Sequence, residues 1–126
     1  MKRKILIIED NEHNLYLAKY ILEQSNYEVF SALDGPSGIE MANLVKPDLI
    51  LLDIQLPVMD GYTVARNLRE NSCLADTPIV AVTAYAMPEV IKVGYDGCIE
   101  KPINPDTFVA KVCRHFTVRD QQRKGK

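Results

Sequence analysis

Short apolar runs that end at polar side chains constrain the fold of this chain more than any other feature. Apolar runs of about four to eight residues are typical of strands buried on both faces, as in a parallel sheet. The carboxyl ends of parallel strands meet at one edge of the sheet, where ligands bind. The runs lie at 4–8, 48–52, 79–82 and 98–100, and they lead into Glu9 and Asp10, Asp53, Thr83 and Lys101. We therefore expect three carboxylates, one hydroxyl and one ammonium in a single crevice.

Helical patterns alternate with these strands, which is typical of an α/β fold. The first helix follows Asn11, a good capping residue, and runs to about Ser25. The remaining predicted elements are a more exposed strand at 27–32 and helices at 36–46, 62–70, 88–93 and 104–116. The helix at 88–93 has room for barely two turns. The result is a doubly wound domain of five strands and five helices over 1–118, with a polar tail or linker at 119–126.

Composition excludes several classes of protein. A chain of 126 residues suits one compact domain, and its net charge of −2 provides no basic face for nucleic acid. No apolar stretch approaches the roughly 20 residues of a membrane span, and the N-terminus leads directly into a strand rather than a signal sequence. Cys73, Cys98 and Cys113 lack CxxC spacing, which argues against disulfides and zinc. We expect a cytoplasmic protein without nucleic-acid or membrane partners.

The polar strand ends have the composition of a phosphoryl-transfer site. Mg²⁺ prefers carboxylate and carbonyl oxygens, so Glu9, Asp10 and Asp53 offer an incomplete oxygen cage for it. A bound cation offsets the repulsion among the carboxylates and keeps Asp53 ionised as a nucleophile. Lys101 and the Thr83 hydroxyl suit the other phosphoryl oxygens, because catalysis of this reaction is mostly positioning and charge neutralisation.

Each of these residues also has an ordinary structural interpretation. A strand-end acid such as Glu9 or Asp10 is commonly a helix cap or turn residue. Thr83 alone suits a strand, and Lys101 alone suits a solvated surface. Asp53 is harder to explain in this way, because it closes the most apolar strand with no helix start beside it. The functional interpretation is preferred, because the structural one requires all five residues to reach strand ends by accident.

Together and in this order, the motifs resemble the receiver domain of two-component response regulators, of the single-domain or hybrid-kinase type. The resemblance covers about Lys4 to Phe116 and implies a flavodoxin-like sheet with strand order 2-1-3-4-5. The motifs that carry it are Ile8-Glu9-Asp10-Asn11, Leu52-Asp53-Ile54-Gln55-Leu56-Pro57, Met59-Asp60-Gly61, Val82-Thr83-Ala84 and Lys101-Pro102.

The resemblance implies a role for each matching residue. Asp53 would be the phosphorylation site, and Glu9 and Asp10 would bind Mg²⁺, or Mn²⁺, together with the backbone carbonyl of Gln55. The remaining assignments are contacts to the phosphoryl group from Thr83 and Lys101, a cis bond at Lys101-Pro102, and possible switch positions at Ala84, Cys98 and Pro102.

The resemblance also implies partners. The donor would be a phosphohistidine on a sensor histidine kinase or a histidine phosphotransfer protein, and a downstream protein would read the phosphorylated state. Docking candidates are Asn14, Leu15 and the corner at Pro102 and Ile103. Such a protein is a signalling phosphoacceptor, not an enzyme in the usual sense, although it catalyses its own phosphorylation and dephosphorylation. We expect a monomer or weak dimer.

Two departures from the family pattern bear on signalling. Cys98 stands where the family usually has an aromatic residue, three positions before Lys101. The segment from Thr83 to Lys101 is also about four residues shorter than is typical, roughly one helical turn. The shortening falls in the predicted fourth helix, so we expect intact phosphorylation chemistry with an unusual output.

Two further classes of function remain open. A receiver-like binding module that signals without phosphorylation would agree with Cys98 and the short fourth helix. A Mg²⁺-dependent phosphatase is disfavoured, because Gln55 stands where such enzymes place a second aspartate. A dinucleotide-binding domain is disfavoured as well, since the first strand leads into acids and not into GxGxxG.

Overall fold

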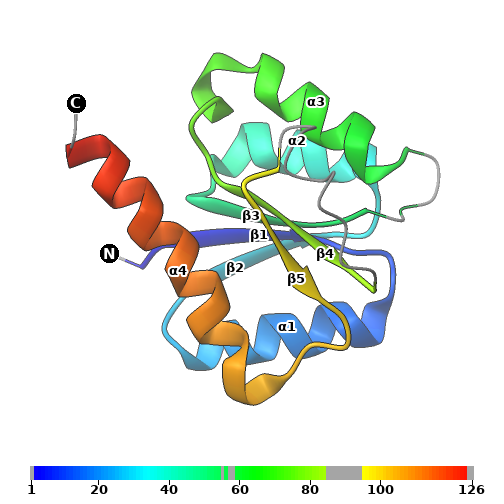
Figure 1. The fold of residues 1–126 in the computed structure, drawn as a ribbon. Helices are drawn as coiled ribbons and strands as arrows, with labels where there is room; N and C mark the ends of the chain where they lie inside the picture. The colour runs from blue at the N-terminus through cyan, green and yellow to red at the C-terminus, as the bar shows by residue number, and fades with distance from the viewer. Residues whose placement is uncertain (1, 55, 57–58, 85–94, 125–126) are drawn as a thin grey trace.

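A five-stranded parallel sheet forms the centre of the molecule (Figure 1). The computed structural model describes residues 2–54, 56, 59–84 and 95–124, with the backbone alone from 117 onward. The strands are β1 (Lys4–Ile8), β2 (Glu28–Ala32), β3 (Leu49–Asp53), β4 (Ile79–Thr83) and β5 (Gly97–Glu100). Their spatial order is β2-β1-β3-β4-β5, which confirms the predicted fold class and strand order.

Helices cover both faces of the sheet, as a doubly wound topology requires. The described helices are α1 (Glu12–Gln24), α2 (Gly35–Val45), α3 (Gly61–Glu70), the 3-10 turn η1 (Ser72–Leu74) and α4 (Pro105–Lys124). Helices α2 and α3 lie on one face, and α1 and α4 lie on the other (Figure 1). The helix predicted at 88–93 lies outside the described residues. The label α4 therefore belongs to the helix that was predicted at 104–116.

Side-chain caps start the first three helices. The Asn11 side chain accepts a hydrogen bond from the backbone N–H of Asn14 at 3.0 Å. Asp34 and Asp60 accept in the same way at the starts of α2 and α3, at 2.8 and 2.9 Å. Each such cap stabilises its helix by about 1 kcal/mol. Because the helices follow the strands directly, the caps lie toward the carboxyl edge of the sheet.

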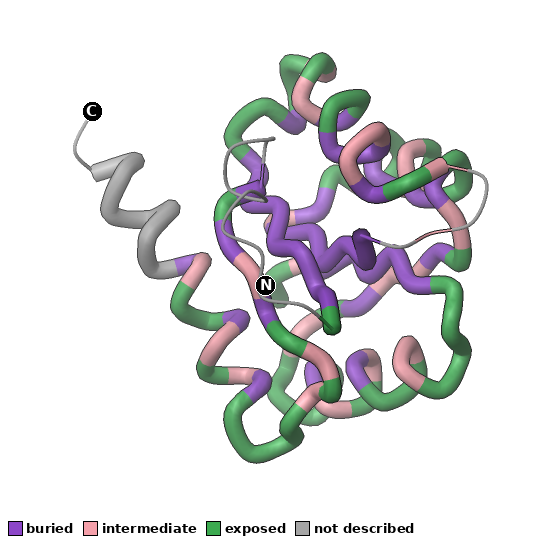
Figure 2. Tube along the Cα trace, turned by 45° about the vertical axis from the view of Figure 1, so that its right-hand side comes forward, coloured by how far each residue is buried: buried purple, intermediate pink, exposed green. Residues whose placement is uncertain are grey.

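The core consists of two apolar clusters, one on each face of the sheet. Alternate residues of β1 enter different clusters: Leu6 and Ile8 face α2 and α3, whereas Ile5 and Ile7 face α1 and α4. This alternation is the period of two expected of a strand. All residues of β3 and β4 are buried, and Figure 2 shows the buried residues concentrated along the strands. The strands nearest the site are therefore rigidly held.

Helix α4 is longer than the sequence prediction. We expected the helix to end near Phe116 and a polar tail to follow, but the helical backbone continues to Lys124. Residues 117–124 contain no glycine or proline and are rich in Arg, Gln and Lys, which favour helix. The Phe116 ring still packs inward as predicted, stacked on Tyr27 with 5.7 Å between ring centroids. Within the described residues, no helix combines the length and apolar character needed to cross a bilayer.

Candidate functional site

Polar side chains from four strands meet at the carboxyl edge of the sheet. Glu9 follows β1, Asp53 ends β3 and Thr83 ends β4, and these side chains are buried in an otherwise apolar core. Strand β3 is paired with both β1 and β4, with Leu52 beside Ile8 and Asp53 beside Val82. The register thus brings the three strand ends to one place, as the apolar runs predicted.

Lys101 reaches this edge from the end of β5. Its Nζ donates hydrogen bonds to Glu9 Oε1 at 2.9 Å and to Asp53 Oδ2 at 3.1 Å. The Lys101 backbone N–H donates to the Thr83 carbonyl at 2.7 Å, which fixes the lysine beside the end of β4. Two carboxylates therefore share one ammonium in a partly buried site.

The single charge of Lys101 does not balance the charges of the carboxylates around it. The pKa of Glu9 is raised to about 7, mainly by burial and also by Asp53, while Lys101 opposes the shift. Burial lowers the pKa of Lys101, but its hydrogen bonds and charge interactions with Glu9 and Asp53 outweigh this and raise the pKa overall. Glu9 Oε2 is buried and has no hydrogen-bond partner in the part of the chain that the structure describes. A second cation at this site would stabilise the ionised form of Glu9 and would provide a partner for its buried oxygen.

The carboxylates are spaced to hold such a cation. One oxygen each from Glu9, Asp10 and Asp53 can be chosen so that all three lie within 4.8 Å of one another. Glu9 and Asp53 are buried, whereas Asp10 is exposed and leaves one side open to solvent. Oxygen ligands with open positions fit Mg²⁺, which retains several waters. The fourth expected ligand, the carbonyl of Gln55, lies outside the described residues.

The residues expected around this centre differ in exposure. The Lys101–Pro102 peptide bond is cis, as the resemblance implied. Pro102 and Ala84 are exposed, and Cys98 is half-buried against the cluster that faces α2 and α3. Ile103 is partly buried and packs against the other cluster.

Tyr95 is an aromatic residue close to this site that the sequence did not predict. Tyr95 is 3% exposed and belongs to the same cluster that Cys98 contacts. Its ring packs edge-on against Tyr62, with 6.0 Å between centroids. The residue precedes β5 in a connection, and no periodic pattern marks a buried side chain there. Its size and the apolar strand that follows were the only available signals.

Comparison with known proteins agrees with this geometry. The response regulator receiver domain family matches the chain over residues 5–113. The polar-differentiation response regulator DivK of Brucella anthropi is 36% identical over 116 residues, which cover 89% of this chain and 94% of that protein.

Two solved structures show the same fold. The chemotaxis protein CheY4 of Vibrio cholerae superimposes with a TM-score of 0.86 at 30% identity, covering 90% of this chain and 98% of that one. The receiver domain of the sensor histidine kinase PA1611 of Pseudomonas aeruginosa, which carries a magnesium ion in its active site cleft, has a TM-score of 0.80 at 29% identity. That comparison covers 92% of this chain and 95% of the receiver domain. Sheet order, the acidic strand ends and these matches lead to one conclusion: the chain belongs to the response regulator receiver domain family.

Proposed function

We propose that this protein is a phosphoacceptor signalling domain that takes a phosphoryl group from a phosphohistidine onto Asp53. The observation that carries the proposal is the buried carboxylate of Asp53, held at 3.1 Å by Lys101 and bordered by Glu9 and Asp10. Receiver domains are signalling domains, and this chain matches them over nearly its whole length. The acidic set supports chemistry at Asp53 and not merely a shared fold.

In the proposed reaction, a carboxylate oxygen of Asp53 forms a bond to phosphorus as the bond from phosphorus to the donor imidazole nitrogen breaks. The imidazole keeps the bonding electron pair. Lys101 already hydrogen-bonds Asp53, so its charge lies where negative charge develops on the phosphoryl oxygens. Thr83, buried at the end of the adjacent strand, supplies a hydroxyl for another of these oxygens. In the later hydrolysis, a water oxygen forms a bond to phosphorus as the bond from phosphorus to the Asp53 oxygen breaks, which releases inorganic phosphate and returns Asp53 to a free carboxylate.

Mg²⁺ is the proposed cofactor, held by the carboxylates of Glu9, Asp10 and Asp53 with the backbone carbonyl of Gln55. Its chemistry is charge neutralisation between the carboxylates and the incoming phosphoryl group. The raised pKa of Glu9 and its unpartnered oxygen support this assignment. The magnesium ion in the PA1611 receiver domain supports it as well. Mn²⁺ suits the same hard oxygen ligands.

The proposed donor is a sensor histidine kinase or a histidine phosphotransfer protein, and the reader of the phosphorylated state is a downstream protein. Asn14 and Leu15 near the start of α1, with the corner at Pro102 and Ile103, are the proposed docking surface for the donor. Asn14, Leu15 and Ile103 are each half-buried, so part of each side chain remains available. We further propose a cytoplasmic location, a monomeric or weakly dimeric state, and no nucleic-acid or membrane partner.

The test is the intact mass of the protein after incubation with phosphoramidate, with and without Mg²⁺. We expect a Mg²⁺-dependent gain of one phosphoryl group in the wild type. Asp53→Asn should abolish the gain, while Asp76→Asn, at an exposed turn, should retain it. No gain in the wild type would contradict the proposal and favour a receiver-like module that signals without phosphate. A gain that persists in Asp53→Asn would contradict the site assignment.

A further inference from the structure

Tyr95 carries a buried hydroxyl that nothing in the chemistry above uses. The side chain lies in the cluster that faces α2 and α3, and its hydroxyl has no hydrogen-bond partner among the described residues. An unpaired buried hydroxyl costs roughly as much free energy as the hydrogen bond it has lost. Such a group calls for a physical explanation, because buried polar atoms are nearly always paired.

The hydroxyl lies near the start of α3 and the backbone of Asp53 and Ile54. A Cβ placed on Gly61 would come within 2.6 Å of the Tyr95 hydroxyl oxygen. It would also lie 2.7 Å from the Asp53 carbonyl oxygen and 2.7 Å from the Ile54 Cα. The hydroxyl and the backbone of Asp53 and Ile54 thus surround one point at the start of α3. Gly61 provides the space, and its N–H donates to the Ile54 carbonyl at 2.9 Å.

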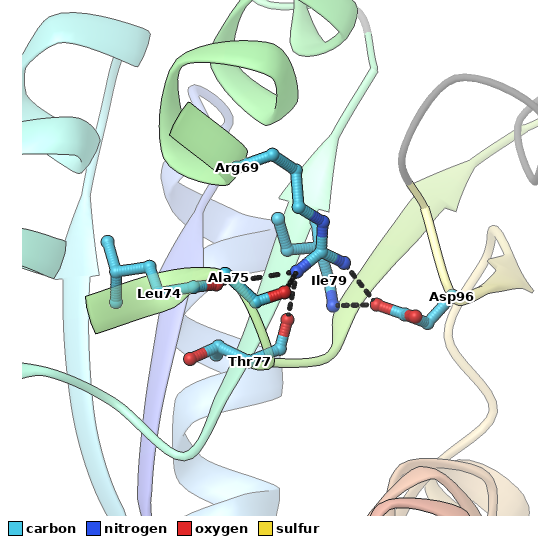
Figure 3. Close-up of polar contacts among 6 residues, drawn as sticks. All are labelled: Arg69, Leu74, Ala75, Thr77, Ile79 and Asp96. Carbon is cyan, nitrogen blue, oxygen red and sulfur yellow. Dashed lines mark hydrogen bonds and ion pairs between the residues drawn. The ribbon is translucent and has the colours of Figure 1, made fainter. Parts of the chain in front are cut away.

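The residue next to Tyr95 is anchored at the opposite edge of the sheet. The Asp96 N–H donates to the Ile79 carbonyl at 2.7 Å, and the Asp96 carboxylate accepts from the Ile79 N–H at 2.8 Å. The same carboxylate pairs with the Arg69 guanidinium, which also donates to the carbonyls of Thr77 and Ala75 at 2.6 and 3.1 Å (Figure 3). This network fixes the main chain beside Tyr95. The tyrosine side chain therefore extends from a fixed point of the main chain to the backbone at Asp53.

A tyrosine hydroxyl is protonated at neutral pH and is therefore able to donate. Burial raises the pKa of Tyr95, and the negative charges of Asp60 and Asp53 raise it further, together with Tyr62. A protonated donor beside backbone atoms needs only a small movement of that backbone to gain an acceptor. The group on this backbone that changes chemically in the proposed reaction is Asp53.

We infer that Tyr95 is a positioning residue, whose hydroxyl gains a hydrogen-bond partner from the backbone of Asp53 or Ile54 when Asp53 carries a phosphoryl group. This inference rests on the proposed function. The paired hydroxyl would favour the phosphorylated arrangement and link it to the start of β5. Tyr95 would act through the backbone and not on the phosphoryl group itself.

The experiment compares Tyr95→Phe with wild type and with Tyr16→Phe, which alters a tyrosine that is 70% exposed on α1. Beryllofluoride with Mg²⁺ serves as a reversible mimic of the phosphoryl group on Asp53, and its affinity is measured by titration. We expect Tyr95→Phe to weaken this affinity roughly two- to tenfold, the effect of one neutral hydrogen bond. Its midpoint of thermal unfolding without beryllofluoride should equal or exceed that of wild type, because the unpaired hydroxyl is gone. Tyr16→Phe should change neither quantity.

A spectroscopic measurement separates this role from simple packing. Protein labelled with 3-fluorotyrosine should show a ¹⁹F resonance that is missing in Tyr95→Phe and that shifts when beryllofluoride binds. Unchanged beryllofluoride affinity in Tyr95→Phe, with an unshifted resonance in the wild type, would overturn this inference and leave the proposed function intact. Wild type that neither binds beryllofluoride nor accepts a phosphoryl group would overturn both.

Discussion

The Lys101 Nζ lies 3.1 Å from Asp53 Oδ2, although their strands, β5 and β3, are separated by β4. The lysine therefore reaches across the end of a whole strand to meet the carboxylate. Its long side chain makes this contact possible, and its burial makes the contact strong, since the charges are partly removed from water. The contact is a property of the sheet order, because no local segment contains both residues.

Removal of the Lys101 charge should slow phosphorylation far more than it alters the fold. We expect Lys101→Met to reduce the initial rate with phosphoramidate by about 10²- to 10³-fold, the usual effect of losing one transition-state donor. The rate is measured by intact mass against time. Lys111→Met, on the partly exposed face of α4, is the matched control and should react like wild type. Equal rates in the two variants would refute the role assigned to Lys101.

Loss of the Glu9 charge should abolish most of the stabilisation by Mg²⁺. At a Mg²⁺ concentration about 100 times the dissociation constant, we expect wild type to gain about 2.7 kcal/mol in free energy of unfolding. Glu9→Gln should gain less than about 1 kcal/mol at the same concentration, because one buried ligand charge is lost. Urea denaturation with and without MgCl₂ measures both gains. The exposed Glu70→Gln should behave as wild type, and an undiminished gain in Glu9→Gln would remove Glu9 from the metal site.

Gly61 should resist any larger side chain. A Cβ at this position would meet backbone atoms of Asp53 and Ile54, which cannot rotate away. We expect Gly61→Ala to lower the free energy of unfolding by about 1–3 kcal/mol. At Gly38 the close neighbours are side-chain atoms of Ile8 and not backbone atoms, so Gly38→Ala should cost less. Urea denaturation of both variants makes the comparison, and a larger loss at Gly38 would contradict the described packing.

His115 should make stability depend on pH. Burial lowers the pKa of His115, with Arg114 acting in the same direction and Asp96 opposing it. The ring lies against Gly97 in β5. Above the unfolded value of 6.5 the imidazole is neutral in both states. As the pH falls below that value, the unfolded chain takes up a proton before the folded chain does, so the folded state loses stability.

The measurement is the free energy of unfolding at about pH 7.5 and about pH 5.5, on either side of the unfolded pKa of histidine. We expect His115→Gln to lose less stability over this range than wild type. Glu9 acts in the opposite direction, because its folded pKa is raised to about 7, but it is present in both proteins and cancels in the comparison. The exposed His13→Gln should follow wild type. Parallel profiles for wild type and His115→Gln would exclude this contribution.

The strands and most of the site were predictable because their signals are local. An apolar run ending at Asp53 identifies both a buried strand and a polar strand end, and the parallel arrangement then brings Glu9 and Lys101 to the same edge. Asn11 was predictable as a cap for the same reason: its side chain bonds to its own helix start, three residues away.

The missed features depend on contacts between distant parts of the chain or on weak terminal signals. The buried position of Tyr95 is set by Tyr62 on α3 and by the anchored Asp96, neither of which leaves a periodic pattern. The turn η1 is held by short-range hydrogen bonds at Asn71, whose side chain accepts from the Cys73 N–H and whose carbonyl accepts from the Leu74 N–H, each at 2.9 Å. Helix α4 ends later than predicted, because the apolar residues stop at about Phe116 whereas the helical backbone continues to Lys124.

The caps described for α1, α2 and α3 have a consequence for electrostatics. Each peptide unit of a helix carries a dipole, and together these place about half a positive charge at the N-terminus. In this topology the helices begin next to the carboxyl ends of the strands, so their positive ends are directed toward the edge that holds Asp53. These positive helix ends offset part of the repulsion that a dianion would meet from Glu9, Asp10 and Asp53 at this edge. The order of strands and helices along the chain therefore contributes to the binding of a phosphoryl group at this edge.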